Sequence, residues 1–349
     1  MINFRLISTW LILLGVLLLL VGGILLASRS PALGSPAITD TPLAVQSSSP
    51  RTQMFIATSI APTAVPPSLT PLSLPSTTPT ATILRALQFD GERAYDQVLA
   101  QEAIGPRPTG SEAGWATGDY IVDQLNKLGW SVQTQEFVFQ GVRGRNIIGK
   151  AGEGPLIILG AHYDTRPVAD RDPDPNNRTQ PILGANDGAS GVAVLLELAR
   201  VLNRDELPNQ VWLAFFDAED RGRLEGWPFS VGAREMAQGL MLRPQAVVVV
   251  DMIGDADQNI YYERNSDMEL SAQLWAIAAK LGYKDNIIPE PRHTIIDDHL
   301  PFVEQGIPSV DMIDFDYAYW HTLEDTADKV SPTSLERVGR TLEVWLEGE

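Results

Sequence analysis

PLIILGA at residues 155–161 is an uninterrupted apolar run, and His162, Tyr163 and Asp164 follow it directly. A short apolar run without alternating polar residues is typical of a strand that is buried on both faces of a sheet. Comparable runs recur along the chain at 132–139 (VQTQEFVF), 211–217 (VWLAFFD), 246–254 (AVVVVDMIG) and 307–313 (IPSVDMI). Together these segments predict the strands of a buried sheet.

Segments with helical periodicity lie between and around these runs. Apolar residues recur at intervals of three and four at 92–103, 111–129, 191–203, 268–282 and 333–348. Ser111 and Gly129 are typical of the start and the end of a helix. Strands that alternate with helices predict an α/β domain with a mixed, mostly parallel central sheet flanked by helices.

The N-terminal part of the chain differs in composition from the rest. Residues 6–27 are apolar and uncharged, and a bilayer core needs about 20 such residues, so we expect a transmembrane signal anchor or a signal peptide at 1–27. Residues 28–83 contain 10 of the chain's 25 prolines among Ser and Thr, which predicts a disordered linker. The folded domain is expected at 84–349. It would be membrane-anchored and extracytoplasmic, or secreted if the signal is cleaved.

Charge and cysteine content exclude several classes of function. The 349 residues include 26 basic and 44 acidic residues, a formal net charge of −18, whereas a nucleic-acid-binding protein needs a basic face. No Gly-rich phosphate-binding motif is present, so we expect neither a nucleic-acid partner nor a nucleotide cofactor. The chain also contains no cysteine. A transition metal would therefore have to be bound by His, Asp or Glu.

Histidines and carboxylates stand where predicted strands end, which is where open α/β sheets bind ligands. These residues are His162, Glu219, Asp220, Asp251 and His321, and Asp187 directly precedes a predicted helix. Singly, each has a simpler interpretation, because Asp187 could cap its helix and Glu219–Asp220 could form an exposed charged corner. Together, in a chain without cysteine, they supply the oxygen and nitrogen donors that a zinc site requires.

Several stretches resemble the bacterial-type glutaminyl cyclases, which belong to a zinc aminopeptidase family that shares their fold. The stretches are AHYDTRPVADRDPDPNNRTQPILGANDGASGV (161–192), FFDAED (215–220), VVDMIG (249–254), DDHLPF (297–302) and YWHTLEDT (319–326). Their order and spacing agree from about residue 90 to residue 345. The resemblance implies a mixed sheet flanked by helices that holds one or two zinc ions.

The resemblance also implies roles for individual residues. The implied primary zinc ligands are Asp187, Asp220 and His321, the implied catalytic residues are Glu219, Asp251 and Asp298, and the implied pocket walls are Trp227 and Trp320. Glu219 would act as general acid and base, and the two catalytic aspartates would orient the reacting amine. Many relatives have Glu-Glu at the position of Glu219-Asp220, so one expected metal ligand is shorter here by a methylene group.

The expected reaction is the cyclisation of N-terminal glutaminyl residues of peptides or proteins to pyroglutamate, with release of ammonia and with one zinc ion. The alternative is a zinc aminopeptidase that hydrolyses N-terminal residues. In that enzyme His162, Asp187 and Asp251 would hold a second zinc ion. The ligand sets of the two enzymes overlap almost completely, so the ligands alone do not separate them.

Two features favour the cyclase over the aminopeptidase. They are the doubled Asp297-Asp298 before His299 and the tryptophans at positions 227 and 320. An inactive binding or scaffold protein is a third interpretation. The intact Glu219 and the complete set of candidate ligands argue against it.

Overall fold

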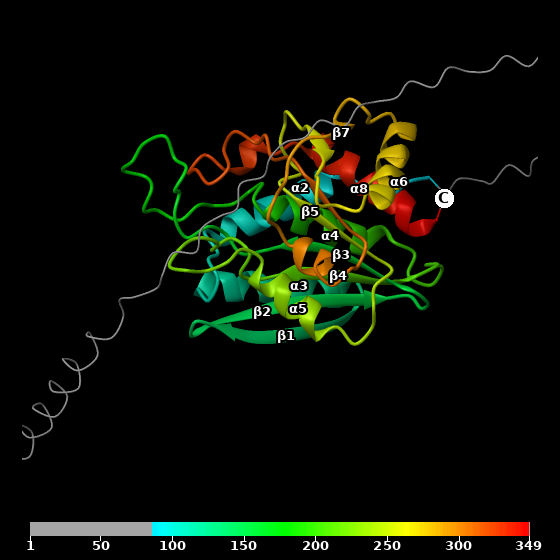
Figure 1. Cartoon of the computed structure of the whole chain (residues 1–349), viewed down its shortest axis with the longest axis horizontal. Coiled ribbons are helices and arrows are strands. Elements are labelled where there is room, and N and C mark those ends of the chain that lie inside the picture. The colour runs from blue at the N-terminus through cyan, green and yellow to red at the C-terminus, as the bar shows by residue number, and fades with distance from the viewer. Residues whose placement is uncertain (1–85, 349) are drawn as a thin grey trace, which may run out of the picture. The chain divides into compact units, whose positions relative to one another are not determined.

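The computed structural model describes residues 86–348 (Figure 1). The predicted signal anchor at 1–27 and the predicted linker at 28–83 lie outside the described residues. Within residues 86–348, no helix combines the length and the apolar character needed to cross a membrane. The α/β domain expected from the sequence is thus described almost from its predicted first residue.

A six-stranded mixed sheet forms the centre of the described part of the chain (Figure 1). Its strands, in spatial order, are β1 (Ser131–Phe139), β2 (Val142–Ala151), β4 (Gln210–Phe216), β3 (Leu156–His162), β5 (Ala246–Asp251) and β8 (Ser309–Ile313). Strands β4, β3, β5 and β8 pair in parallel, whereas β2 is antiparallel to both β1 and β4. The mixed, mostly parallel sheet predicted from the sequence is confirmed.

Helices cover both faces of this sheet. The larger core lies between the sheet and α2 (Gly91–Ile104), α3 (Glu112–Lys127), α4 (Ala189–Val201), α6 (Met268–Lys280) and α8 (Pro332–Glu347). A smaller core on the opposite face includes residues of α5 (Val231–Gly239) and α7 (Leu300–Val303). The remaining elements are the parallel pair β6 (Ile260–Tyr262) and β7 (Ile287–Pro291), and the 3-10 helix η1 (Ala327–Lys329).

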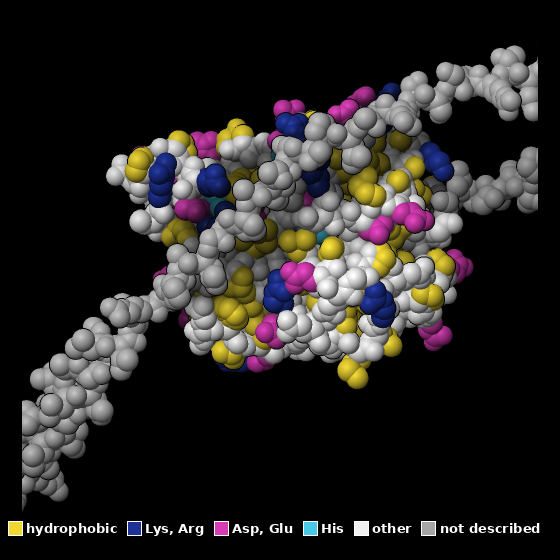
Figure 2. Space-filling view, viewed as in Figure 1, with side chains coloured by type: hydrophobic (Ala, Val, Ile, Leu, Met, Phe, Trp, Pro, Cys, Tyr) yellow, Lys and Arg dark blue, Asp and Glu magenta, His cyan; other side chains and the backbone are white. Residues whose placement is uncertain are grey.

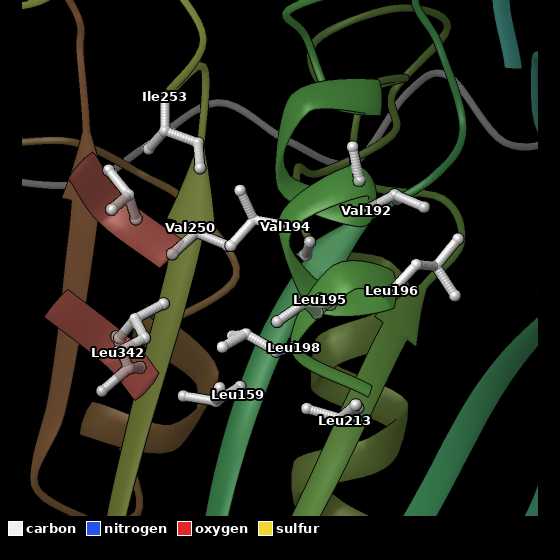
Figure 3. Packing of buried hydrophobic residues seen from close by; sticks show 14 of the residues in the cluster. Leu159, Val192, Val194, Leu195, Leu196, Leu198, Leu213, Val250, Ile253 and Leu342 are labelled. Atoms are coloured by element: carbon white, nitrogen blue, oxygen red, sulfur yellow. The ribbon is translucent and has the colours of Figure 1, made fainter. Parts of the chain in front are cut away.

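Alternate residues of the central strands point into the two cores, as strand geometry requires. In β3, Leu159 belongs to the larger core and Ile158 to the smaller one. Figure 3 shows Leu159 close to Leu198 of α4, a helix that is buried along nearly its whole length. Because packing on both faces holds β3 and β5, the positions of the residues at their carboxyl ends are closely determined.

Charged side chains of both signs occur on the surface of the described residues. On the face that Figure 2 shows, Asp and Glu side chains are interspersed with Lys and Arg side chains. The acidic excess is therefore not gathered into one patch on that face.

One predicted strand lies in a different environment from the one expected. Residues 132–139 do form part of β1, but β1 is the edge strand of the sheet, and within it Phe137 alone is buried. The interpretation of this run as a buried strand was wrong because its first half is polar. Strand β2 was not predicted, since Arg143, Gly144 and Arg145 interrupt its apolar pattern.

Candidate metal centre and active site

The parallel strands bring the candidate residues to one edge of the sheet. Strand β3 ends at His162 and β5 ends at Asp251, while Glu219 and Asp220 follow the end of β4. Parallel strands have their carboxyl ends at the same edge, so these side chains converge although they are distant in sequence. Asp187 reaches the same place from the loop before α4.

Asp187, Asp220 and His321 form a compact set of possible metal ligands. Each is buried and offers one ligand atom, and the three atoms lie within 4.8 Å of one another. His321 Nε2 lies 3.0 Å from Asp220 Oδ1 and 3.7 Å from Asp187 Oδ2. The shorter aspartate at position 220 thus reaches its neighbours despite the missing methylene group.

Two carboxylate oxygens in this set lack a hydrogen-bond partner, which indicates that a cation fits there. Asp187 Oδ2 and Asp220 Oδ2 are buried and have no hydrogen-bond partner. Buried carboxylate oxygens without partners are costly unless a cation or a proton compensates them. His nitrogens and Asp oxygens are both zinc ligands, and three protein ligands are the number that a catalytic zinc site uses when it keeps a further position open. The residues present therefore fit a zinc ion.

The position of Asp187 is set by residues that the sequence analysis did not identify. The Asp325 carboxylate accepts hydrogen bonds from the backbone N–H groups of Asn186 (2.8 Å) and Asp187 (3.2 Å). The fully buried Arg107 guanidinium donates to the carbonyl oxygens of Leu183 and Gly184 in the same loop. Asp187 makes no capping hydrogen bond to α4, so the capping interpretation does not apply.

His321 is oriented by a carboxylate on its other ring nitrogen. His321 Nδ1 lies 3.1 Å from Asp170 Oδ1, and Arg166 donates two hydrogen bonds to the Asp170 carboxylate. Arg166 also donates to the backbone carbonyl of Asp220, so one arginine connects two of the candidate ligands. Although burial alone would lower it, the carboxylates of Asp220 and Asp170 raise the pKa of His321 to about 9 in the metal-free protein.

Replacing Asp170 with Asn is expected to weaken zinc binding by about 10–100-fold, the usual effect of removing a carboxylate that orients a histidine ligand. The amide keeps the size of the side chain but loses the charge that supports the His321 ring. Zinc affinity would be measured by competition with a chromophoric chelator. Asp174→Asn, an exposed residue in the same loop, is the matched control and should bind zinc like the wild type. Equal affinities in both variants would contradict this role of Asp170.

A second set of possible ligands shares Asp187 with the first. His162 Nε2 lies 3.1 Å from Asp187 Oδ1 and 3.2 Å from Asp251 Oδ1, and the three residues again offer ligand atoms within 4.8 Å of one another. The two oxygens of Asp187 thus face different imidazoles, His162 on one side and His321 on the other. The side chains can accommodate a second metal ion.

Glu219 is held beside the first ligand set by its own backbone. Its N–H donates to Asp164 Oδ1 (3.0 Å), and the N–H of Asp220 donates to Asp164 Oδ2 (3.1 Å). Burial raises the pKa of Glu219 well above its ordinary value, and the nearby Asp297 and Asp220 add to the effect against the opposing influence of His162. A carboxyl group with a raised pKa suits both the acceptance and the return of a proton.

A cavity of about 300 Å³ opens beside these residues. It is lined by the candidate ligands Asp187, Asp220 and His321, by the carboxylates Glu219, Asp251 and Asp297, and by apolar side chains that include Phe229, Ile295, Phe315 and Trp320. Burial raises the pKa of Asp251 to about 7. The cavity thus offers carboxylates for a cationic group and an aromatic wall for the stem of a side chain.

Two residues expected at the pocket lie elsewhere. The lining includes Asp297 but not its neighbour Asp298, which is fully buried. Trp227 is also absent from the lining, because its ring packs edge-on against Phe139 with the centroids 4.8 Å apart. Phe229 lines the cavity from the same loop. The aromatic side chain and the aspartate that line the cavity here are therefore Phe229 and Asp297 rather than Trp227 and Asp298.

Comparisons with known proteins agree with this architecture. Residues 146–346 match the model of peptidase family M28. A structure of a Bacteroides thetaiotaomicron glutaminyl cyclase bound to N-acetylhistamine is 32% identical and covers 76% of this chain and 100% of that chain, with a TM-score of 0.72. A structure described as a leucine aminopeptidase precursor from the same organism is also 32% identical, covers 76% and 99%, and has a TM-score of 0.72.

A curated relative is more distant in sequence but covers a similar part of the chain. The glutaminyl-peptide cyclotransferase-like protein of Bos taurus is 24% identical over 309 residues, which are 77% of this chain and 78% of that protein. Proteins named as cyclases and as peptidases therefore both resemble this chain over most of its length. The match to the family model covers more than half of the residues, and the chain belongs to peptidase family M28.

Proposed function

We propose that this protein cyclises N-terminal glutaminyl residues of peptides or proteins to pyroglutamate and releases ammonia. The observation that carries the proposal is the small cavity in which Glu219 and two further carboxylates, Asp251 and Asp297, lie beside the Asp187/Asp220/His321 set. The similarity to solved glutaminyl cyclases at about one third sequence identity supports it.

In the proposed reaction, the α-amino nitrogen of the substrate bonds to the γ-carbonyl carbon of its own side chain. The bond from that carbon to the amide nitrogen breaks, and one proton moves from the amine to the departing ammonia. A zinc ion held by Asp187, Asp220 and His321 would supply Lewis-acid polarisation of the γ-carbonyl. Because nucleophile and electrophile belong to one residue, correct orientation contributes much of the rate.

The side chains of this protein would bind and orient the substrate and move the proton. Glu219 accepts a proton from the α-amine and delivers it to the leaving nitrogen. The Asp251 and Asp297 carboxylates attract the amino group, and Trp320 restricts the width of the pocket. Asp298, which the resemblance implied for the amine, is fully buried and does not line the cavity, so it would act only indirectly.

The second candidate is an aminopeptidase, and the His162/Asp187/Asp251 set favours it. A second metal ion there would help to activate water and to hold the free amine of a peptide. Incubation of the purified protein with Gln-peptides and with Leu-peptides separates the two reactions. Mass spectrometry should show loss of ammonia from the Gln-peptides and no shortening of either peptide. Release of free amino acids without ammonia would overturn the cyclase proposal.

Replacing His162 with Ala is expected to lower cyclase activity by about 10–100-fold without changing the zinc content, because His162 orients Asp187 and Asp251 rather than binding metal. Activity would be measured with a Gln-peptide, and zinc by elemental analysis of the same sample. Loss of one zinc ion per chain together with loss of Leu-peptide cleavage would favour the aminopeptidase instead.

A further inference from the structure

A further cluster of titratable side chains extends from the wall of the catalytic cavity, where Asp297 lies, into the protein interior. Asp297, His299 and Asp311, called the deep cluster below, are at most 3% exposed. His299 directly precedes α7, and Asp311 lies in β8, between Val310 and Met312 of the larger core. Asp311 therefore points toward the opposite face of the sheet, the face on which α7 lies. The deep cluster shares no residue with the two ligand sets of the cavity.

Most polar atoms of the deep cluster have no hydrogen-bond partner. His299 Nδ1, both carboxylate oxygens of Asp311 and Oδ2 of Asp297 are buried and make no hydrogen bond. The ion pairs found within residues 86–348 connect neither aspartate to a lysine or an arginine. Native proteins rarely leave buried polar atoms unpaired, because an unpaired buried polar group destabilises the fold. Three of these atoms are carboxylate oxygens, and their accumulation at one place points to a missing partner with positive charge.

The spacing of the deep cluster fits a metal ion. Its three residues each offer one ligand atom, and these atoms lie within 4.8 Å of one another. His299 Nδ1 and Asp311 Oδ2 are 3.5 Å apart. Two ligands of a tetrahedral zinc ion, each about 2.0–2.2 Å from the metal, are separated by roughly 3.3–3.6 Å. The observed distance would allow both atoms to bind one ion.

The other ring nitrogen of His299 is placed as in known metal sites. His299 Nε2 lies 3.2 Å from Glu263 Oε2, and metal-binding histidines commonly direct their second nitrogen at a carboxylate. Glu263 is itself fixed by hydrogen bonds from the backbone N–H groups of Asn265 (2.7 Å) and Ile295 (2.9 Å) and from the Ser266 hydroxyl (3.1 Å). The ring of His299 is thus positioned to direct Nδ1 toward the two aspartates.

We propose that Asp297, His299 and Asp311 bind a divalent transition-metal ion, of the class that accepts imidazole and carboxylate ligands, behind the catalytic cavity. The ion would connect the loop before α7 to β8. Because Asp297 also lines the cavity, the ion would fix that part of the cavity wall. The competing explanation is a doubly protonated His299 between Glu263 and Asp311, with a proton shared among the aspartates. In that case the cluster would hold no metal.

The test compares the metal content of full-length variants by inductively coupled plasma mass spectrometry. Asp311→Asn should contain about one metal equivalent per chain less than the wild type, because it removes one of three protein ligands. Asp314→Asn is the matched control, since Asp314 is an equally buried aspartate just beyond the same strand. It should retain the wild-type metal content.

Combining Asp311→Asn with a substitution of a cavity ligand shows which of the two ions is lost. His321→Ala should lose the cavity ion and keep the deep ion, and Asp311→Asn/His321→Ala should lose both. A cooperatively melting Asp311→Asn with wild-type metal content would overturn the proposal in favour of the protonated histidine. If that variant does not fold, anomalous scattering from zinc-soaked wild-type crystals decides, because a peak at His299 supports the site and its absence rejects it. These measurements do not use turnover, so they are independent of the proposed reaction.

Discussion

Glu219→Gln is expected to keep the zinc of the cavity and to lose turnover by about 10²–10⁴-fold, the usual contribution of a general acid and base. The amide has nearly the same shape as the carboxyl group but can neither accept nor return the proton of the substrate amine. The backbone hydrogen bonds from residues 219 and 220 to Asp164 do not involve the replaced side chain, so the local structure should persist.

The measurement combines ammonia release from a Gln-peptide with zinc analysis of the same preparation. Glu225→Gln is the matched control, because Glu225 is exposed in the loop that follows and is absent from the cavity lining. It should show wild-type turnover. A Glu219→Gln enzyme with bound zinc and near-native rates would show that Glu219 has a structural role only.

Removal of a primary ligand should have the largest effect of all. Asp220→Ala and His321→Ala are each expected to lose the cavity zinc and all measurable activity, because two remaining protein ligands compete poorly with water for the ion. His293→Ala is the control for a histidine outside the cavity, where it pairs with Asp316. Elemental analysis and the Gln-peptide assay provide the two readouts.

Asp187→Ala should affect metal binding differently from substitution of the other two ligands. Since its two oxygens face His162 and His321, the substitution would remove a ligand from both sets. If the protein binds a second ion at His162 and Asp251, Asp187→Ala should release both ions, whereas Asp220→Ala should release one. Full zinc retention in any of the three variants would remove that residue from the ligand set.

The sequence predicted the parallel strands well because they are largely apolar and are buried on both faces. The runs before His162 and Asp251 are of this kind, and the rule that ligands bind beyond strand ends led to the residues that now line the cavity. Strand β1 was misinterpreted, and β2 was not predicted. Both strands belong to the antiparallel part of the sheet and carry exposed residues, so their composition is mixed and a search for apolar runs misjudges them.

Other features of the site depend on loop conformation and could not be predicted from periodicity. Asp170, Arg166 and Asp325 support the ligands through hydrogen bonds across the fold, and no local pattern distinguishes them from solvated loop residues. The resemblance implied Asp298, but Asp297 lines the cavity, since consecutive residues of a loop can face opposite sides. In a loop, the role of a residue depends on the local direction of the backbone. The pattern of apolar and polar residues does not determine that direction.

The two backbone hydrogen bonds that Asp164 accepts constrain how this site can change during evolution. One oxygen of its carboxylate holds the backbone of Glu219 and the other holds that of Asp220, so a single side chain positions both the proton acceptor and a candidate metal ligand. Substitutions at Asp164 would then alter metal affinity and proton transfer together. Natural selection could not improve one property independently through this residue, and compensating mutations would have to arise in pairs.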